Sequence, residues 1–492
     1  MGVYLKYTNS RYTPIMDYCF DLIGDHLDTA SFASLKAVDK DTYDLLSDIS
    51  YLQNAEMRSR RIAYEVLELR QDVLMVGPGG CGKTYTINKI LELGKVKDMK
   101  IAVCSTTGIS ACNFDGGSTL HSFAKMGLAT MTMEAIQDKY DNTGQVMGGG
   151  KQWRAFDLLI VDEVSMLGRR FFEKLDLCAR LARNSKQPFG GLQVLFSGDF
   201  LQLPPVMDSF VFTSERWSKF KFKVFHLDIP VRQSGDTSFY RMLNRIRWGK
   251  IKNRDIRRLK NRIIEKELPT DAQGFRVPTL YPRNKDINPE NNRVYSSLPQ
   301  EEERVVYAND SIVRRTRENG GWIYRPWVKM TIKQALKAAP KGYLVKYPTT
   351  IPLKKGAQYF LTFNVETGLG FVNGAISLYQ GENRFLFRNG KVLEDMKEVT
   401  TFIPLGGNLY LKRSQLPLKL GYAVTIHSSQ GMTLEQARID IGDGVFTSAQ
   451  TYVALSRVRR LDGVYLTSFN EDKIRCPKKA AEYYRKLLKV AQ

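Results

Sequence analysis

The fold of this 492-residue chain is decided by one stretch, Val73-Leu74-Met75-Val76-Gly77-Pro78-Gly79-Gly80-Cys81-Gly82-Lys83-Thr84. Its first four residues are apolar and predict a buried strand, and the residues after it, Tyr85–Leu93, predict a helix. The glycine-rich segment matches the pattern GxxxxGK[ST]. Glycines let backbone N–H groups approach phosphate oxygens closely, and the amino terminus of the helix adds partial positive charge. The stretch therefore predicts a site for the phosphates of a nucleoside triphosphate.

Two side chains of this stretch have separate expected tasks. Lys83 supplies a positive charge to the phosphates, and the Thr84 hydroxyl is a ligand for Mg²⁺. The residues expected to bind the nucleotide are Gly77, Gly79, Gly80, Cys81, Gly82, Lys83 and Thr84.

A metal site of this kind also needs a carboxylate at the end of a neighbouring strand. The apolar run Leu158–Val161 predicts a buried strand, and Asp162 and Glu163 follow it directly. Asp162 is expected to join Thr84 in the Mg²⁺ shell. Glu163 is then placed to orient and deprotonate the attacking water. Together with the glycine-rich loop, this pair predicts hydrolysis of the triphosphate.

The composition indicates a soluble globular protein with a polyanionic partner. The chain has 73 Lys and Arg against 51 Asp and Glu, and the net charge of +22 favours nucleic acid. No apolar run approaches the ~18 residues of a membrane-spanning helix, and the amino terminus lacks the apolar core of a signal peptide. Six scattered cysteines indicate free thiols in a reducing compartment. We expect an intracellular protein, in the nucleus, in a mitochondrion or, for a virus, at a cytoplasmic replication site.

The pattern of apolar residues along the chain predicts an α/β protein with an inserted β module and a helical amino-terminal segment. Short β-branched runs at 73–76, 100–104, 158–161 and 193–197 alternate with amphipathic stretches, which is typical of a parallel sheet with crossover helices. Residues 300–400 are rich in Gly and aromatic residues and predict an inserted β module. Residues 1–50 predict short amphipathic helices that form a packing extension. A faint resemblance to an F-box-like adaptor is the alternative, and it suggests a protein partner.

Motifs between and beyond these two sites resemble those of one helicase family. Residues 105–111 and 117–123 resemble motif Ia of superfamily 1B helicases, and 162–206 resembles the petite-integration-frequency (Pif) family of DNA helicases, including its Phe-Gly-Gly segment at 189–191. Further matches, in family order, lie at 231–233, 243–247, 370–374, 424–434 and 452–457. The resemblance runs from about residue 52 to the carboxyl end.

The resemblance implies two tandem RecA-like P-loop domains with parallel sheets. Residues 1–51 would form a helical extension, and 52–228 the first RecA-like domain, with a small wedge-type insertion at about 118–152. The second RecA-like domain would comprise 229–300 and 416–492, interrupted by an SH3-like β insertion at 301–415.

The resemblance also implies roles for single residues. Gln202 corresponds to the motif III residue that senses the γ-phosphate, and Gly431 borders the nucleotide. Arg232 and Arg457 correspond to arginines that reach across from the second domain, where delocalised guanidinium charge suits the phosphoryl transition state. The residues expected to contact DNA are Thr107, His121, Phe123, His427, Ser428 and Ser429.

The implied activity is ATP- and Mg²⁺-dependent DNA unwinding by a monomer that moves 5′-to-3′ on single-stranded DNA. Its substrates would be duplexes, forks, RNA–DNA hybrids or G-quadruplexes in replication, repair or recombination. Three alternatives stay open: a RecD-like helicase of the same superfamily, a DNA-stimulated translocase or protein displacer, and a non-enzymatic adaptor with an idle nucleotide site.

The chain departs from the family pattern at three places. Ser428 stands where the family commonly has Lys, which removes one cation from a phosphate-gripping loop. The glutamine that reads adenine is replaced by Met57, with Gln53 as a possible substitute. Cys81 within the glycine-rich loop predicts sensitivity of the ATPase to thiol reagents.

Two segments carry much of the excess positive charge. Residues 241–266 and 311–355 each hold eleven Lys and Arg, interleaved with aromatic residues such as Trp248 and Trp327. Cationic grooves with stacking faces are typical of single-stranded DNA binding. A solvated charged face is the alternative for both segments.

Overall fold

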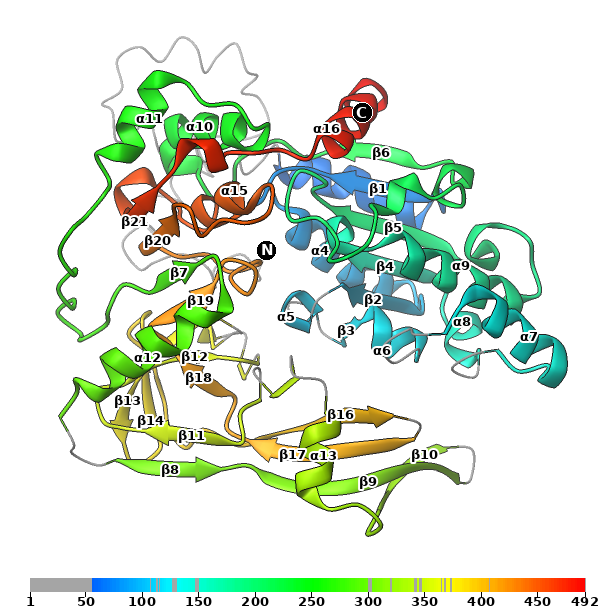
Figure 1. Cartoon of the computed structure of the whole chain (residues 1–492). Helices are drawn as coiled ribbons and strands as arrows, with labels where there is room; N and C mark the ends of the chain where they lie inside the picture. The colour runs from blue at the N-terminus through cyan, green and yellow to red at the C-terminus, as the bar shows by residue number, and fades with distance from the viewer. Residues whose placement is uncertain are drawn as a thin grey trace. The chain divides into compact units, whose positions relative to one another are not determined.

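The computed structural model describes residues 55–491 except 107, 112–113, 115, 126–130, 147–149, 300–302, 319–320, 340–342, 345–346, 364, 367–368, 372–373 and 407 (Figure 1). The chain divides into a unit at Met1–Gln53 and a second at Asn54–Gln492, and the second is described below. The helices and the F-box-like pattern expected at 1–50 lie outside the described residues.

A six-stranded parallel sheet in the order β3-β2-β4-β5-β1-β6 contains the predicted phosphate loop at its edge. The four predicted strands are present, each within one residue of its expected bounds. The strands are β1 (Val73–Val76), β2 (Ile101–Ser105), β3 (Ser118–Thr119), β4 (Leu158–Asp162), β5 (Gln193–Gly198) and β6 (Lys223–His226).

Both faces of this sheet are covered, as the continuous apolar runs of its strands require. In β1 the side chains of Leu74 and Val76 enter one core, whereas those of Val73 and Met75 enter the other. One face packs against α9 (Arg169–Arg183), and the other against α4 (Lys83–Val96) and a helix at 55–67. This arrangement fixes the loop between β1 and α4 at the carboxyl edge of the sheet.

Short helices lie just before, within and at the end of the region expected to hold the small insertion, about 118–152. They are α5 (Gly108–Ala111), α6 (Leu120–Ala124), α7 (Met133–Thr143) and α8 (Lys151–Ala155). Phe123 of α6 and Trp153 of α8 pack edge to face with ring centroids 5.0 Å apart. Phe189, from the Phe-Gly-Gly segment, adopts a φ of 47° and its N–H donates to the buried carboxylate of Asp176 in α9. The Phe189 ring also packs edge to face on Trp153 of α8 and on Phe196 of β5, so the segment connects α8 and α9 to the sheet.

A second parallel sheet has the order β19-β7-β20-β21. Its strands are β7 (Thr279–Tyr281), β19 (Ala423–Thr425), β20 (Ala437–Ile441) and β21 (Val464–Phe469). Its helices are α10 (Thr237–Arg247), α11 (Asn253–Lys260), α12 (Ile287–Ser296) and α15 (Gln450–Leu455). Two parallel sheets, each covered by helices, confirm the expected fold class.

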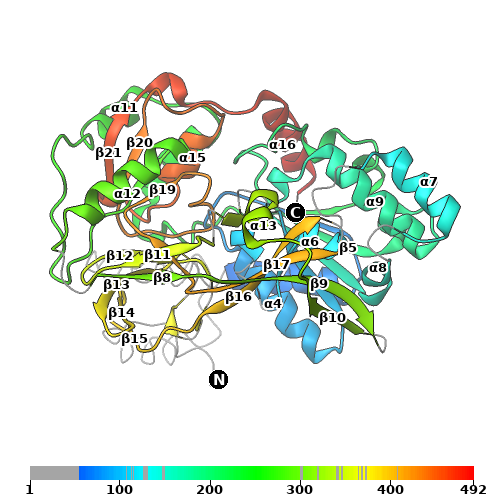
Figure 2. The same cartoon turned by 60° about the horizontal axis from the view of Figure 1, so that its bottom comes forward.

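Antiparallel strands between β7 and β19 form the inserted β module, which Figure 2 brings forward. The sheets are β10-β9-β17-β16, β11-β8 and β15-β14-β13-β12-β18. Their bounds are β8 (Arg304–Tyr307), β9 (Asn309–Glu318), β10 (Gly321–Pro326), β11 (Thr350–Leu353), β12 (Gln358–Leu361), β13 (Ile376–Gly381), β14 (Arg384–Phe387), β15 (Val392–Leu393), β16 (Val399–Gly406), β17 (Leu409–Gln415) and β18 (Leu418–Leu420), with one helix, α13 (Ile332–Ala338).

The last helix, α16 (Lys478–Val490), packs into the core of the first sheet rather than the second. Ala480, Tyr484 and Leu487 are buried there, and the Tyr484 ring meets His226 of β6 edge to face with centroids 5.9 Å apart. The expected division placed 416–492 with the second sheet. The apolar face of α16 finds its partner on the first because that face covers the edge strand β6.

No helix among the described residues is long and apolar enough to cross a membrane. Cys81, Cys104, Cys178 and Cys476 are free thiols, as expected. Cys19 and Cys112 lie outside the described residues.

Candidate functional site

The loop between β1 and α4 has the geometry of a phosphate cradle. Gly80 and Gly82 have φ angles of 82° and 83°, which L side chains rarely adopt. The Lys83 ammonium donates to the carbonyls of Gly77 and Pro78 at 2.7 and 2.8 Å, so it lies inside the loop. No side chain caps the amino terminus of α4 and its first turn has no acidic residue. Its N–H groups are therefore directed at the loop, where an anion would bind.

The predicted carboxylates stand beside this loop. Asp162 ends β4 and is 4% exposed, and Glu163 follows it with a φ of 56°, a conformation that is costly outside glycine. Burial raises the pKa of Asp162, and burial together with the charge of Asp162 raises the pKa of Glu163 to about 7. Lys83 acts in the opposite direction on both. Raised pKa values mean that the two carboxylates are costly to ionise in this enclosed site. A bound cation would therefore be favoured beside them.

The oxygen donors here fit a hard divalent cation. The Asp162 carboxylate and the half-buried Thr84 hydroxyl are the ligand types that Mg²⁺ prefers, and Mg²⁺ usually takes its remaining ligands from phosphates and water. The described residues contain no group of three or more His, Cys, Asp or Glu side chains arranged to hold a metal by themselves. Such a site would therefore need the nucleotide's own oxygens.

Gln202 and a second glutamine connect Glu163 to the other sheet. Gln202 is 3% exposed in the loop after β5. The side-chain amide of Gln430, in the loop after β19, donates to Gln202 Oε1 at 3.3 Å and lies 3.4 Å from Glu163 Oε2. Sequence reasoning missed Gln430 as a site residue, although it lies inside a quoted motif beside Gly431. Gly431 itself is exposed with a φ of 87°, and its place in the nucleotide set stays a prediction.

The two predicted arginines reach the loop from different sides: Arg457 comes from the second sheet, whereas Arg232 lies in the segment between β6 and α10, where its N–H donates to the carbonyl of Gly80 at 3.0 Å. Arg457, at the end of α15, is 2% exposed, and a Cβ added at Gly79 would lie 3.2 Å from Arg457 Nη2. Arg232 donates to the carbonyl of Ser456 at 2.9 Å. Burial lowers the pKa of each guanidinium, and Arg457 lowers that of Arg232 further. Among the described residues neither arginine forms a salt bridge, so the pair suits a polyanion.

Another contact crosses between the same elements. The hydroxyl of Tyr452 in α15 accepts a hydrogen bond from the N–H of Gly79 at 3.1 Å. Sequence reasoning missed this role of Tyr452. A hydrogen bond to the loop backbone could not be assigned from the tyrosine's position in its motif alone.

The structure contradicts the expectation that Cys81 makes the site sensitive to thiol reagents. Cys81 is 3% exposed, and burial raises the pKa of its thiol to about 11. Its sulfur lies 3.9 Å from the Tyr240 hydroxyl. The thiolate is the reactive form, so a buried, protonated thiol reacts slowly. Cys81 therefore packs the underside of the loop.

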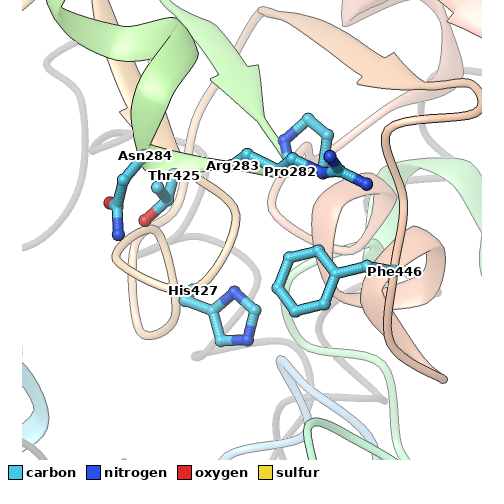
Figure 3. Close-up of a pocket in the computed structure, with 6 residues that line it drawn as sticks. All are labelled: Pro282, Arg283, Asn284, Thr425, His427 and Phe446. Carbon is cyan, nitrogen blue, oxygen red and sulfur yellow. The ribbon is translucent and has the colours of Figure 1, made fainter.

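A pocket of about 380 Å³ lies at the carboxyl edge of the second sheet. It is lined by Pro282, Arg283, Asn284, Thr425, His427 and Phe446. Figure 3 shows the His427 and Phe446 rings next to each other, and their centroids are 5.8 Å apart with planes inclined by 13°. Phe446 is 61% exposed, so much of its ring is accessible from solvent. His427 thus lines this pocket, and its contact with DNA stays a prediction.

Sequence reasoning missed Arg283, Asn284 and Phe446 in this pocket. Arg283 and Asn284 follow strand β7 closely. Ligands of open parallel sheets bind beyond the carboxyl ends of strands. That rule would have singled out both residues, whereas Phe446 comes from a loop far along the chain.

Three more of the predicted DNA contacts are Ser428, Ser429 and Thr107. Ser428 is half-buried, and its N–H donates to the Thr425 hydroxyl at 3.0 Å. Ser429 is wholly buried and donates to the carbonyl of Ile426 at 2.8 Å, so it shapes the loop instead of facing a phosphate. Thr107 lies outside the described residues.

Beside the first sheet, the structure places His121 and Phe123 of α6 in different surroundings. Phe123 is 8% exposed and packs in the core, so little of its ring faces solvent, and its contact with DNA stays a prediction. His121 stacks on Phe171 with centroids 4.0 Å apart, and burial lowers its pKa. It retains partial exposure and stays a candidate contact.

Part of the charge at 241–266 and 311–355 serves the fold. Arg245 binds both carboxylate oxygens of Asp255 at 2.7 Å. Arg314 covers the Trp327 ring at 4.8 Å, with Lys329 at 5.8 Å from the same ring. A stacking face already covered by cations is less open to a base than the sequence suggested.

Comparisons with known proteins agree with this arrangement. The family model described as PIF1-like helicase matches residues 57–257. The ATP-dependent DNA helicase PIF1 of Danio rerio is 33% identical over 85% of this chain and 62% of its own length. The crystal structure of Pif1 helicase from Candida albicans matches with a TM-score of 0.70 and 27% identity, covering 87% of this chain and 98% of that one.

A further structure, Bacteroides Pif1 bound to ssDNA, matches at 23% identity with a TM-score of 0.62 over 88% of this chain and 96% of that one, and shows the fold alone. The chain spans about three fifths of the length of the curated relatives it matches. With its motifs in family order on two parallel sheets, the chain contains a PIF1-like helicase region at 57–257 and is similar to PIF1 helicases over 85% of its length.

Proposed function

We propose that this protein is an ATP- and Mg²⁺-dependent DNA helicase that moves 5′-to-3′ along single-stranded DNA and unwinds duplexes, RNA–DNA hybrids or G-quadruplexes. One observation carries the proposal. Gln430 touches both Glu163 and Gln202 at the phosphate site, and it lies three residues from His427 in the pocket on the second sheet. A change at the triphosphate is thus one short loop away from a surface that can hold a base.

The residues divide the hydrolysis among themselves. Lys83 and the loop N–H groups hold the triphosphate, and Thr84 and Asp162 would hold Mg²⁺, which supplies charge neutralisation when bound. Glu163 accepts the proton of the attacking water, and Gln202 orients that water and the γ-phosphate. Arg232 and Arg457 stabilise the charge that spreads over the transferred phosphoryl group. Adenine selection has no assigned residue, because Gln53 lies outside the described residues.

Contacts across the site provide the coupling to movement. Arg457 and Tyr452 approach the loop from the second sheet, and Arg232, whose N–H is bonded to Gly80, reaches back to the carbonyl of Ser456. Nucleotide binding adds attraction between the two sheets, and loss of the γ-phosphate removes it. Alternating closure and opening would move the second sheet and its pocket relative to the first.

On the DNA side, the pocket offers one stacking face and one cation. Phe446 and His427 present rings to a base, and Arg283 supplies positive charge for the backbone. The DNA would therefore pass the carboxyl edge of the second sheet, with His121 as a contact on the first.

Replacing Phe446 with alanine should weaken binding of single-stranded DNA. The loss of one base–aromatic stack costs about 1–3 kcal/mol, which is roughly a 5- to 150-fold rise in Kd. Fluorescence anisotropy with a labelled oligothymidine measures it. Tyr64→Ala, which removes another exposed ring (56% exposed) far from the pocket in sequence, is the control and should bind as the wild type does. Equal Kd values for all three proteins would remove Phe446 from the interface.

The proposed activity is tested by strand displacement on duplexes with a 5′ or a 3′ single-stranded tail, each with and without ATP. We expect unwinding of the 5′-tailed duplex alone, and only with ATP and Mg²⁺. ATP turnover stimulated by DNA without displacement would indicate a translocase or protein displacer. Absence of turnover would indicate an adaptor with an idle nucleotide site, and unwinding from the 3′ tail would reverse the proposed polarity.

We also propose that the active form is a monomer and that residues 1–50 recruit a protein partner. Sedimentation of the full chain with a forked DNA tests the first point, since a monomer should bind with one copy per fork. Deletion of residues 1–50 should leave unwinding intact if that segment serves recruitment only.

A further inference from the structure

A buried ion pair joins α10, which packs on the second sheet, to the first sheet, away from the phosphate loop. Arg247, the last residue of α10, donates from Nε and Nη2 to the two carboxylate oxygens of Asp199 at 2.8 and 2.6 Å. Asp199 follows directly after β5 in the first sheet. Arg247 is 2% exposed and Asp199 is wholly buried. The pair thus fixes one end of α10 to the loop that carries Gln202.

The same carboxylate organises that loop. Asp199 accepts from the N–H of Leu201 at 3.1 Å, and its carbonyl accepts from the N–H of Gln202 at 2.8 Å. The Gln202 side-chain amide lies 3.4 Å from Asp199 Oδ2, and its oxygen accepts from Gln430. A continuous set of polar contacts therefore leads from Arg247 through Asp199 and Gln202 to the residues around Glu163.

An aromatic cover closes the pair from water. The Arg247 guanidinium lies 4.5 Å from the centroid of the Tyr484 ring, and Trp248 meets that ring edge-on at 5.8 Å. Tyr484 belongs to α16 and is wholly buried. The segment before α16 is held against α10 as well, because a Cβ at Gly249 would lie 2.9 Å from the backbone nitrogen of Cys476. The carboxyl-terminal helix is thus part of this connection.

Burying two charges is an inefficient way to stabilise a fold, because their desolvation offsets most of the attraction. Well-packed apolar residues would do as well there. A bidentate pair does fix the relative orientation of its two partners, because the guanidinium fork admits one orientation of the carboxylate. Precision in placing the loop is therefore the property that the pair adds.

We propose that Arg247 is a positioning residue for ATP hydrolysis: through Asp199 it holds Gln202 in the orientation that the reaction needs, under the cover of Tyr484. The proposal rests on the proposed ATPase function and assigns Arg247 no contact with the nucleotide. It also gives α16 a part in the reaction through the ring that packs on the guanidinium.

Three variants test it by steady-state ATPase at saturating single-stranded DNA, with thermal unfolding measured alongside. Arg247→Lys keeps the charge and loses the fork. Asp199→Asn with Arg247→Met removes both charges while keeping an acceptor for the Leu201 N–H, and should fold with a Tm near that of the wild type. Both should lower kcat by about 10- to 100-fold, as expected for a displaced catalytic group, with the KM for ATP within about twofold.

The third variant is Gln202→Ala, which supplies the distinguishing measurement. If Arg247 acts through Gln202, adding Arg247→Lys to Gln202→Ala should change kcat by less than about twofold, because residues that act as a unit are not additive. Arg245→Lys is the matched control. It removes the fork of the pair with Asp255 on the same helix, and its kcat should stay within about twofold of the wild type.

Four outcomes would overturn the proposal: additive losses with Gln202→Ala, an equal loss in Arg245→Lys, losses that follow Tm, or failure of both Arg247 variants to fold. The last would mean that the pair serves the fold alone. A wild type without ATPase activity would overturn the proposed function and this inference together, whereas an active wild type with any of the four outcomes would overturn the inference alone.

Discussion

Replacing Lys83 with alanine should lower DNA-stimulated ATP hydrolysis by about 10²- to 10³-fold or more, while single-stranded DNA still binds. The Lys83 ammonium lies in the loop, 2.7 Å from the carbonyl of Gly77, where the triphosphate would replace the carbonyls as its partner. The variant also loses the charge that opposes the raised pKa values of Asp162 and Glu163. Both effects weaken nucleotide binding and water activation, and neither touches the pocket at His427.

The measurement combines a coupled ATPase assay with anisotropy on a labelled oligonucleotide. Lys97→Ala is the matched control, because it removes a cation just beyond the other end of α4, where Lys97 pairs with Glu68 at 2.7 Å. Exposed pairs of this kind contribute little to stability, so its turnover should equal that of the wild type. Turnover retained by Lys83→Ala would overturn the assignment of the phosphate site.

Replacing Arg457 with alanine should lower kcat by about 10³-fold or more, the size of effect found for arginines that stabilise a phosphoryl transition state. Arg457 is held by its own helix, with Nε donating to the Val453 carbonyl and Nη2 to the Ser456 hydroxyl at 2.9 and 2.7 Å. Such support fixes the guanidinium beside Gly79 before the nucleotide arrives. Arg457→Lys should recover only a small part of the rate, because an ammonium cannot reproduce the planar fork.

Single-turnover hydrolysis at saturating ATP isolates this chemical step from binding. Arg459→Ala serves as the comparison, since Arg459 lies two residues away, half exposed and paired with Glu435 at 2.8 Å. Its rate should match that of the wild type. An Arg457→Ala rate within a few-fold of Arg459→Ala would assign Arg457 to the interface between the sheets and not to the reaction.

The residues at the phosphate site were predictable because their geometry is local. A strand, a glycine-rich turn and a helix follow one another within a few residues, so Lys83 and Thr84 have little freedom once β1 and α4 form. Asp162 was equally predictable, because the carboxyl ends of neighbouring parallel strands meet at one edge. The resemblance to the family then supplied Gln202, Arg232 and Arg457.

The DNA contacts were harder to predict because exposure depends on what packs alongside. Phe123 and Ser429 have side chains suited to DNA binding. However, Phe123 packs against Trp153, and the Ser429 hydroxyl donates its hydrogen bond to the carbonyl of Ile426. The predicted thiol sensitivity at Cys81 was wrong for the same reason, because burial and not the position in the loop sets the reactivity of the thiol. Phe446 escaped notice because an exposed ring in a loop has no periodic pattern to reveal it.

By itself, the sequence determined the parallel α/β architecture, the phosphate loop and the surplus of positive charge, because short-range spacing and composition carry that information. Only the tertiary structure decided that α16 returns to the first sheet, that Arg247 and Asp199 form a buried pair beneath Tyr484, and that His427 and Phe446 share one pocket. Each of these joins residues far apart along the chain. Such contacts depend on which apolar faces bury each other, and no local pattern encodes that choice.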